Sequence, residues 1–110
     1  MKFFEFLQNN SGGFFKVDDK VCGQVIIEAE NVSEAIDIAE DLGIYFDGCS
    51  IGKDCSCCGD RWSEPWSEDG MSLEQLNLII NKENNYRRTD PNTRIFYKDG
   101  TVKEIFANAF

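Results

Sequence analysis

Two short apolar runs near the start of the chain predict strands. "KFFEFLQ" (residues 2–8) is aromatic and short, whereas "VCGQVIIEAE" (residues 21–30) is β-branched and apolar, which favours a central strand. Between them, "NNSGG" (residues 9–13) is typical of a turn, because glycine and asparagine accept positive φ angles. "FFKV" (residues 14–17) begins a further predicted strand.

The pattern then changes to helical spacing after residue 30. Asn31 is a suitable N-cap, and Glu34, three positions later, completes the signature of a capping box. Gly43 suits the left-handed residue just past the end of this helix. The apolar residues that recur at helical spacing and predict its buried stripe are Ala35, Ile38, Ala39 and Leu42.

A second helix is predicted over "SLEQLNLIINKEN". Ser72 and Gln75 form a second capping-box signature at its start. The apolar positions Leu73, Leu76, Ile79 and Ile80 predict its buried stripe. Between the two helices, residues 44–70 are long, irregular and rich in cysteine, glycine and tryptophan, and connections of this length inside a compact domain are often functional.

The chain closes on a hairpin signal, "RIFYKDGTVKEIF", in which Asp99 and Gly100 indicate a two-residue type I′ turn. This register would pair Tyr97 with Val102. The complete order of predicted elements is three strands, a helix, the long loop, a second helix and two strands. It predicts one α+β domain over residues 1–110, with an antiparallel sheet and both helices on one face.

Composition narrows the possible functions. The 110 residues fit one domain, and the net charge of −9 opposes binding to DNA or RNA, whose affinity depends on neutralising phosphates. The absence of histidine removes histidine bases, Cys-His dyads and histidine metal ligands. No apolar run approaches the length of a membrane-spanning helix, and the start is too interrupted to be a secretion signal, so we expect a cytoplasmic protein.

Three of the five cysteines lie in "DCSCCGDRWSEPW", residues 54–66. The Cys55–Cys58 spacing followed by Gly59 is that of a zinc knuckle, but a closed site would need Cys22 and Cys49 from elsewhere. Disulfide exchange is a second interpretation, opposed by the neighbouring acidic residues, which raise thiol pKa values. Packing as small buried hydrophobes is a third. We expect no cofactor, and structural zinc stays the alternative.

The second half of the same stretch has the chemistry of a nucleotide site. Arginine offers a planar fork to phosphate, tryptophan offers a flat face to a base, and glycine lets backbone amides approach a ligand. The plainer alternative is that the tryptophans pack in the core and that the arginine pairs with a nearby aspartate. The candidate ligand-binding residues are Gly12, Gly13, Tyr45, Arg61, Trp62 and Trp66.

The segments "SGGFF", "GIYFDG", "DCSCCGDRW" and "YKDG" together resemble a family of small tailed-bacteriophage proteins. The chain looks similar to the anti-CBASS sponge proteins, which bind a host cyclic-oligonucleotide signal. The resemblance implies a homo-oligomer in the host cytoplasm that holds a cyclic dinucleotide, such as cyclic GMP-AMP, without cleaving it. The contacts expected of Arg61 and Trp62 come from their chemistry and not from the resemblance.

Two functions from different classes therefore stand at this point. The first is a non-enzymatic phage protein that sequesters a cyclic dinucleotide. The alternative is a small acidic protein-interaction module, with or without a zinc knuckle, that inhibits a host protein. An enzyme is the weakest interpretation, because without histidine the catalysis would depend on acid pairs or a cysteine.

Overall fold

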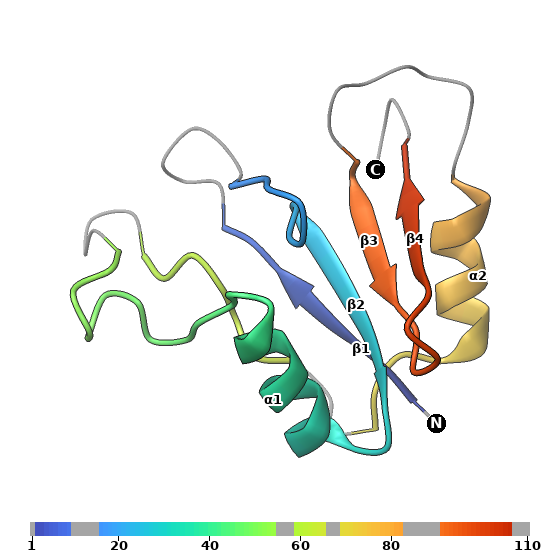
Figure 1. Cartoon of the computed structure of the whole chain (residues 1–110), viewed down its shortest axis with the longest axis horizontal. Coiled ribbons are helices and arrows are strands. Elements are labelled where there is room, and N and C mark those ends of the chain that lie inside the picture. The colour runs from blue at the N-terminus through green and yellow to red at the C-terminus, as the bar shows by residue number, and fades with distance from the viewer. Residues whose placement is uncertain (1, 10–15, 55–58, 66–68, 83–90, 107–110) are drawn as a thin grey trace.

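The protein folds as an α+β domain, as predicted. In the computed structural model, four strands and two helices lie within the residues that the structure describes, which are 2–9, 16–54, 59–65, 69–82 and 91–106. In chain order they are β1 (Lys2–Leu7), β2 (Gln24–Ala29), α1 (Val32–Asp41), α2 (Leu73–Asn81), β3 (Thr93–Phe96) and β4 (Val102–Ile105) (Figure 1). The strand expected at residues 14–17 is not formed by Lys16 and Val17, and Phe14 and Phe15 lie outside the described residues.

The sheet is mixed and mostly antiparallel, in the order β1-β2-β3-β4. β1 pairs with β2, and β3 with β4, in antiparallel fashion, but β2 and β3 run parallel. The expectation of a purely antiparallel sheet is therefore wrong at its centre. The physical reason is the connection, because the chain between β2 and β3 contains both helices and is long enough for the crossover that a parallel pair requires.

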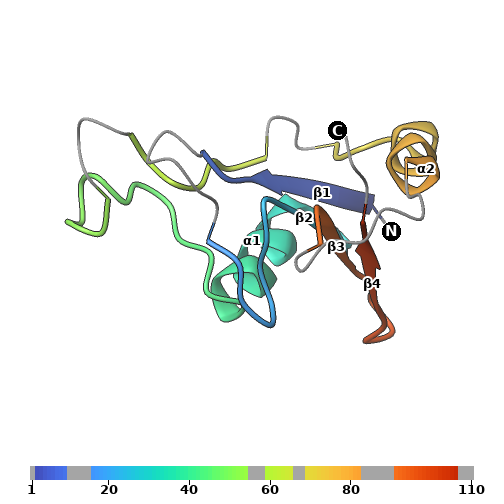
Figure 2. The same cartoon turned by 90° about the horizontal axis from the view of Figure 1, so that it is seen from above.

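The two helices lie on opposite faces of the sheet, and not on one face as predicted (Figure 2). β2 is the reason, since both faces of this central strand are apolar. Val25 and Ile27 are buried in the cluster that contains α1, whereas Ile26, between them, is buried in the cluster that contains α2. A strand that is apolar on both faces requires cover on both sides.

The cluster on the α1 side is the larger one. Phe4 and Phe6 of β1 are fully buried there, together with Ala35 and Ala39 of α1. The side chain of Asn31 caps α1 by accepting a hydrogen bond from the Glu34 amide at 2.9 Å, as predicted. The predicted capping box is not completed, because the Glu34 carboxylate accepts from the Glu30 amide at 3.3 Å. This half of the molecule provides most of the stable core that holds the loop after α1.

α2 is far less buried than its predicted stripe suggests. Its capping box is present, with the Ser72 hydroxyl accepting from the Gln75 amide and the Gln75 side chain accepting from the Ser72 amide. Leu76, however, is the buried residue of this helix, and Leu73 is 66% exposed, contrary to the prediction. Ile79 and Ile80 are half-buried against the smaller cluster. The cluster that α2 joins is the smaller one, with Ile26, Ile95 and Ile105 as its other buried residues, so it covers less of this helix than the main core covers of α1.

The closing hairpin forms in a register that differs by one residue from the prediction. Phe96, and not Tyr97, pairs with Val102, and the Tyr97 amide donates to the Thr101 carbonyl at 2.8 Å. Gly100 has a φ of +92°, whereas Asp99 does not have a positive φ. A type I′ turn needs positive φ at both central residues, so the chain instead forms a three-residue loop with its glycine in the left-handed position.

Candidate functional site

The carboxylate of Asp54 organises the described part of the loop after α1. Its two oxygens accept hydrogen bonds from the Tyr45 hydroxyl at 2.9 Å and from the Arg61 amide at 2.8 Å. The Gly48 carbonyl accepts from the amides of Lys53 and Asp54, which turns the chain back on itself. A Cβ on Gly48 would lie 1.8 Å from an Asp54 carboxylate oxygen, so this close approach requires glycine.

Arg61 connects the loop to β1 through Gln8. Its Nη1 donates to Gln8 Oε1 at 3.1 Å, and its carbonyl accepts from the Asn9 amide at 2.7 Å. The half-buried guanidinium therefore already contacts the protein; the plainer alternative expected an aspartate as its partner, whereas the contact seen here is with the Gln8 side chain. Asp54 accepts a hydrogen bond from the Arg61 amide.

Gln8 is the residue of this site that sequence reasoning missed. Besides Arg61, its side-chain oxygen accepts from the Lys16 amide at 2.8 Å, and its Nε2 donates to the Lys16 and Cys22 carbonyls at 2.6 and 2.9 Å. All four hydrogen-bonding positions of the amide are thus occupied. The signal was present, because strict alternation along residues 2–8 places Gln8 on the same face as Phe4 and Phe6.

Trp62 is a core residue, 2% exposed, and offers no face to a ligand in this structure. It forms an antiparallel bridge opposite Gln8 at the outer edge of β1. Directly opposed residues of an antiparallel pair share one face, so the indole lies on the side of Phe6 and the main core. The expectation that Trp62 stacks on a base is corrected accordingly, and the alternative of core packing is confirmed for this tryptophan.

Tyr45 lies at the border of the core and the loop. It is half-buried, and Lys53 Nζ lies 4.8 Å from the centre of its ring. Burial, and next the hydrogen bond to Asp54, raise the pKa of the Tyr45 hydroxyl. The structure therefore brings Tyr45 and Arg61 together around Asp54. The other candidates, Gly12, Gly13 and Trp66, lie outside the described residues.

The two described cysteines have different surroundings. Cys22 is buried, its Sγ donates to the Gln24 carbonyl at 3.2 Å, and burial raises the pKa of its thiol. Cys49 is half-buried, and its amide donates to Asp60 Oδ1 at 2.9 Å. This hydrogen bond, and next the hydrogen bond from the Cys49 thiol, lower the pKa of the Asp60 carboxyl. Among the described residues, no group of three or more acids and cysteines could hold a metal ion, and Cys55, Cys57 and Cys58 fall outside them.

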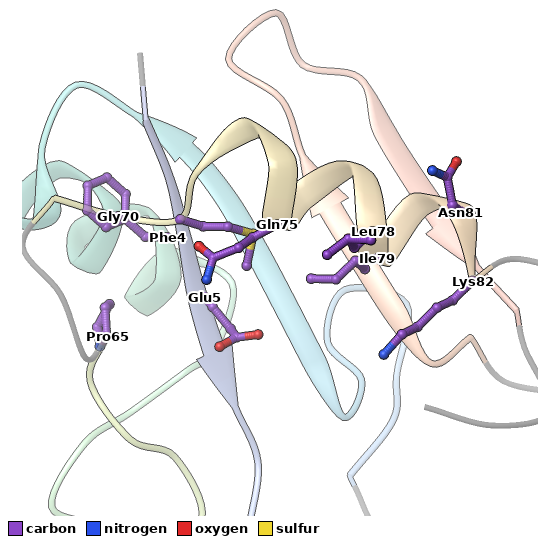
Figure 3. Close-up of a pocket in the computed structure, with 10 residues that line it drawn as sticks. Phe4, Glu5, Pro65, Gly70, Gln75, Leu78, Ile79, Asn81 and Lys82 are labelled. Carbon is purple, nitrogen blue, oxygen red and sulfur yellow. The ribbon is translucent and has the colours of Figure 1, made fainter.

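A groove lies between α2 and β1, away from the Asp54 loop. Its volume is about 580 Å³, and half of its lining residues are apolar. Figure 3 shows Gln75, Leu78 and Ile79 along α2, with Glu5 on β1 below them. We call it the α2 groove, and its lining residues are Phe4, Glu5, Pro65, Gly70, Met71, Gln75, Leu78, Ile79, Asn81 and Lys82.

The wall of the α2 groove is fixed by the chain that runs into α2. The Met71 amide donates to the Phe3 carbonyl at 2.6 Å, which forms a bridge at the outer edge of β1. Gly70 has a φ of +77°, and a Cβ there would lie 2.8 Å from the Phe3 carbonyl oxygen. Only glycine allows this close passage, so the sequence Gly70-Met71 sets where α2 begins relative to the sheet.

A smaller hollow of about 160 Å³ continues along β1 and shares Glu5 with the α2 groove. Glu64 lies at its border and is exposed. Leu78, at 59% exposure, stands beside the α2 groove. Sequence reasoning missed this surface, although Leu78 interrupts the polar side of α2 and was the available signal.

The geometry thus defines an α+β protein with an internally bonded loop and an open apolar groove. The chain belongs to a family described as a domain of unknown function (DUF7296), whose family model matches residues 1–109. No curated protein and no solved structure matches it. Within the described chain, neither helix has the length and apolar character that a membrane crossing requires.

Proposed function

We propose that this protein acts by binding another protein, without catalysis, and that the α2 groove is its binding surface. The observation that carries the proposal is the exposed Leu78 beside an apolar groove, on a helix of which Leu76 is the buried residue. Apolar surface of this kind contributes binding free energy when a partner removes it from water. Glu5 and Gln75 supply polar groups at its border.

The lining of the α2 groove suits a polypeptide better than a nucleotide. Pro65, Met71 and Ile79 offer apolar contacts, whereas the Glu5 carboxylate opposes a phosphate. The net charge of −9 acts in the same direction. The resemblance to small phage proteins suggests that the binding partner is a protein of the host cell, and we propose that binding inhibits it.

Replacing Leu78 with glutamine tests this proposal, with Leu73→Gln as its matched control. Both leucines are exposed on α2, but only Leu78 lines the α2 groove, and glutamine keeps helix propensity in both variants. A host protein retained on the immobilised wild-type chain is identified, purified and titrated against all three proteins. We expect Leu78→Gln to weaken its affinity about tenfold and Leu73→Gln to change it less than about twofold.

Equal affinity of the purified partner for wild type and Leu78→Gln would contradict the use of this surface. Retention of no host protein at all would contradict the function itself. Circular dichroism and thermal denaturation of both variants serve to show that the fold is intact.

A second candidate is sequestration of a cyclic dinucleotide, which the resemblance implies. Lys53 lies over the ring of Tyr45 and Arg61 lies near its hydroxyl, and the two cations of this cluster support the proposal. Asp54, within the same cluster, opposes it, as does the burial of Trp62. On this hypothesis, cyclic GMP-AMP at 100 times its Kd adds about 2.7 kcal/mol of stability. No rise in melting temperature with any cyclic dinucleotide at millimolar concentration would exclude it.

A further inference from the structure

We infer that the partner segment bound in the α2 groove is a basic amphipathic helix that lies along α2. The inference rests on the proposed function and adds the chemistry of the partner. Three observations support it: the bridges at both ends of the β1 edge, the length of α2, and the carboxylates of Glu5 in the α2 groove and Glu64 in the adjoining hollow.

A strand is a poor occupant, because the outer edge of β1 is already bridged at both ends. Phe3 pairs with Met71, and Gln8 pairs with Trp62, so only the short stretch around Glu5 lies between the two bridges. Binding by strand addition needs a longer free edge on which main-chain hydrogen bonds can form. The partner therefore gains its affinity from side chains, as a helix in a groove does.

α2 forms a straight wall that matches a helix of similar length. Its nine residues span about 13 Å, or between two and three helical turns. Gln75, Leu78, Ile79 and Lys82 line the α2 groove at spacings of three, four and seven residues, so they follow one side of α2. A partner helix with apolar residues at positions i, i+3, i+4 and i+7 presents a complementary stripe.

The described residues that line the α2 groove and the adjoining hollow carry two carboxylates and one ammonium, which favours a basic helix. Glu5 lies where the α2 groove meets the smaller hollow, and Glu64 lies at the border of that hollow. Lys82 is the cation of the lining, at the C-terminal end of α2. The net charge of −9 attracts a cationic segment at long range and repels a second copy of this chain.

A synthetic peptide of about fourteen residues tests the inference, with leucines at helical spacing and lysines at the remaining positions. Two control peptides carry glutamate in place of lysine, or the same residues in scrambled order. Affinity is measured by calorimetry over a range of salt concentrations. We expect the basic helical peptide to bind at least about tenfold more tightly than either control, and to weaken as salt rises.

Paired double variants separate local charge from total charge. Glu5→Gln with Glu64→Gln removes two carboxylates beside the groove, whereas Asp37→Asn with Glu40→Gln removes two exposed carboxylates on α1, which covers the other face of the sheet. Both change the net charge equally. We expect the groove variant to lose about fivefold or more in affinity for the basic peptide, and the α1 variant less than about twofold.

Several results would overturn the inference while leaving the proposed function standing. One is an equal loss in the two double variants, which would mean that the peptide responds only to total charge. Another is equal binding of the acidic peptide. A third is a purified host partner that depends on Leu78 although no peptide binds. The oligomeric state of the wild type and of Leu78→Gln is measured by sedimentation. Self-association of the wild type that Leu78→Gln abolishes would identify a second copy of this chain as the occupant of the α2 groove.

Discussion

Replacing Trp62 with alanine lowers the free energy of unfolding by about 3–5 kcal/mol. The indole is 2% exposed and belongs to the same buried cluster as Phe6 and Ile44, so its removal leaves a cavity in the main core. Phenylalanine at this position fills part of the space and is expected to cost less. Urea denaturation of the three proteins measures the difference directly.

Leu78→Ala is the control for the Trp62 prediction, because its side chain is 59% exposed and its loss changes stability by less than about 0.5 kcal/mol. If the Trp62→Ala variant had the same free energy of unfolding as the wild type, the indole would not be part of the core. If that variant also failed to bind a cyclic dinucleotide that the wild type binds, Trp62 would return as a ligand contact.

Replacing Gln8 with leucine is expected to cost about 2–4 kcal/mol, although leucine is the more apolar side chain. The Gln8 amide satisfies the Lys16 amide and carbonyl and the Cys22 carbonyl, and it also receives the Arg61 guanidinium. Each buried polar group that loses its partner costs about 1–3 kcal/mol. The same urea experiment measures this loss of stability. Faster hydrogen exchange of the Lys16 amide in the variant would show that the loss arises at the hydrogen bond from Lys16 to Gln8.

Asn77→Leu makes a comparable polar-to-apolar change at an exposed position of α2, and we expect it to alter stability by no more than about 0.5 kcal/mol. Equal effects of Asn77→Leu and Gln8→Leu would argue against a structural role for the Gln8 amide. If Gln8→Leu lowered the stability but left hydrogen exchange of the Lys16 amide unchanged, the hydrogen bond from Lys16 to Gln8 would not be the cause of the loss.

Local signals in the sequence were sufficient for the starts of both helices. Asn31 and Ser72 each cap a helix because a short polar side chain can accept a bond from an amide three residues away. These bonds involve neighbours in the chain, so no tertiary information is needed to predict them. The same holds for β1 and β2, whose apolar character was plain.

The hairpin between β3 and β4 shows where a local signal is incomplete. Asp99-Gly100 correctly indicated a turn, but whether Asp99 takes a positive φ depends on how the strands are paired on both sides. The Asp99 side chain instead accepts a bond from the Thr101 amide at 2.8 Å, which stabilises the three-residue loop. The register of β3 against β4 therefore differs by one residue from the prediction.

The candidate site was predicted from residue chemistry that the fold uses differently. Arginine and tryptophan suit a nucleotide in the abstract, yet Arg61 contacts Gln8, and Trp62 is buried opposite the same residue. Tyr45 and Arg61 do lie in one cluster, as expected, but around a carboxylate. The α2 groove escaped prediction because its lining combines residues of β1 and α2 with Pro65, Gly70 and Met71, which are distant in sequence from β1.

The sequence by itself determined the α+β class, the helix caps and the apolar strands, because these depend on periodicity and on bonds between near neighbours. Only the tertiary structure decided that β2 and β3 run parallel, that the helices cover opposite faces, and that Leu78 borders an open groove. Those features depend on which distant segments meet, and a contact between distant segments leaves no periodic trace in the chain.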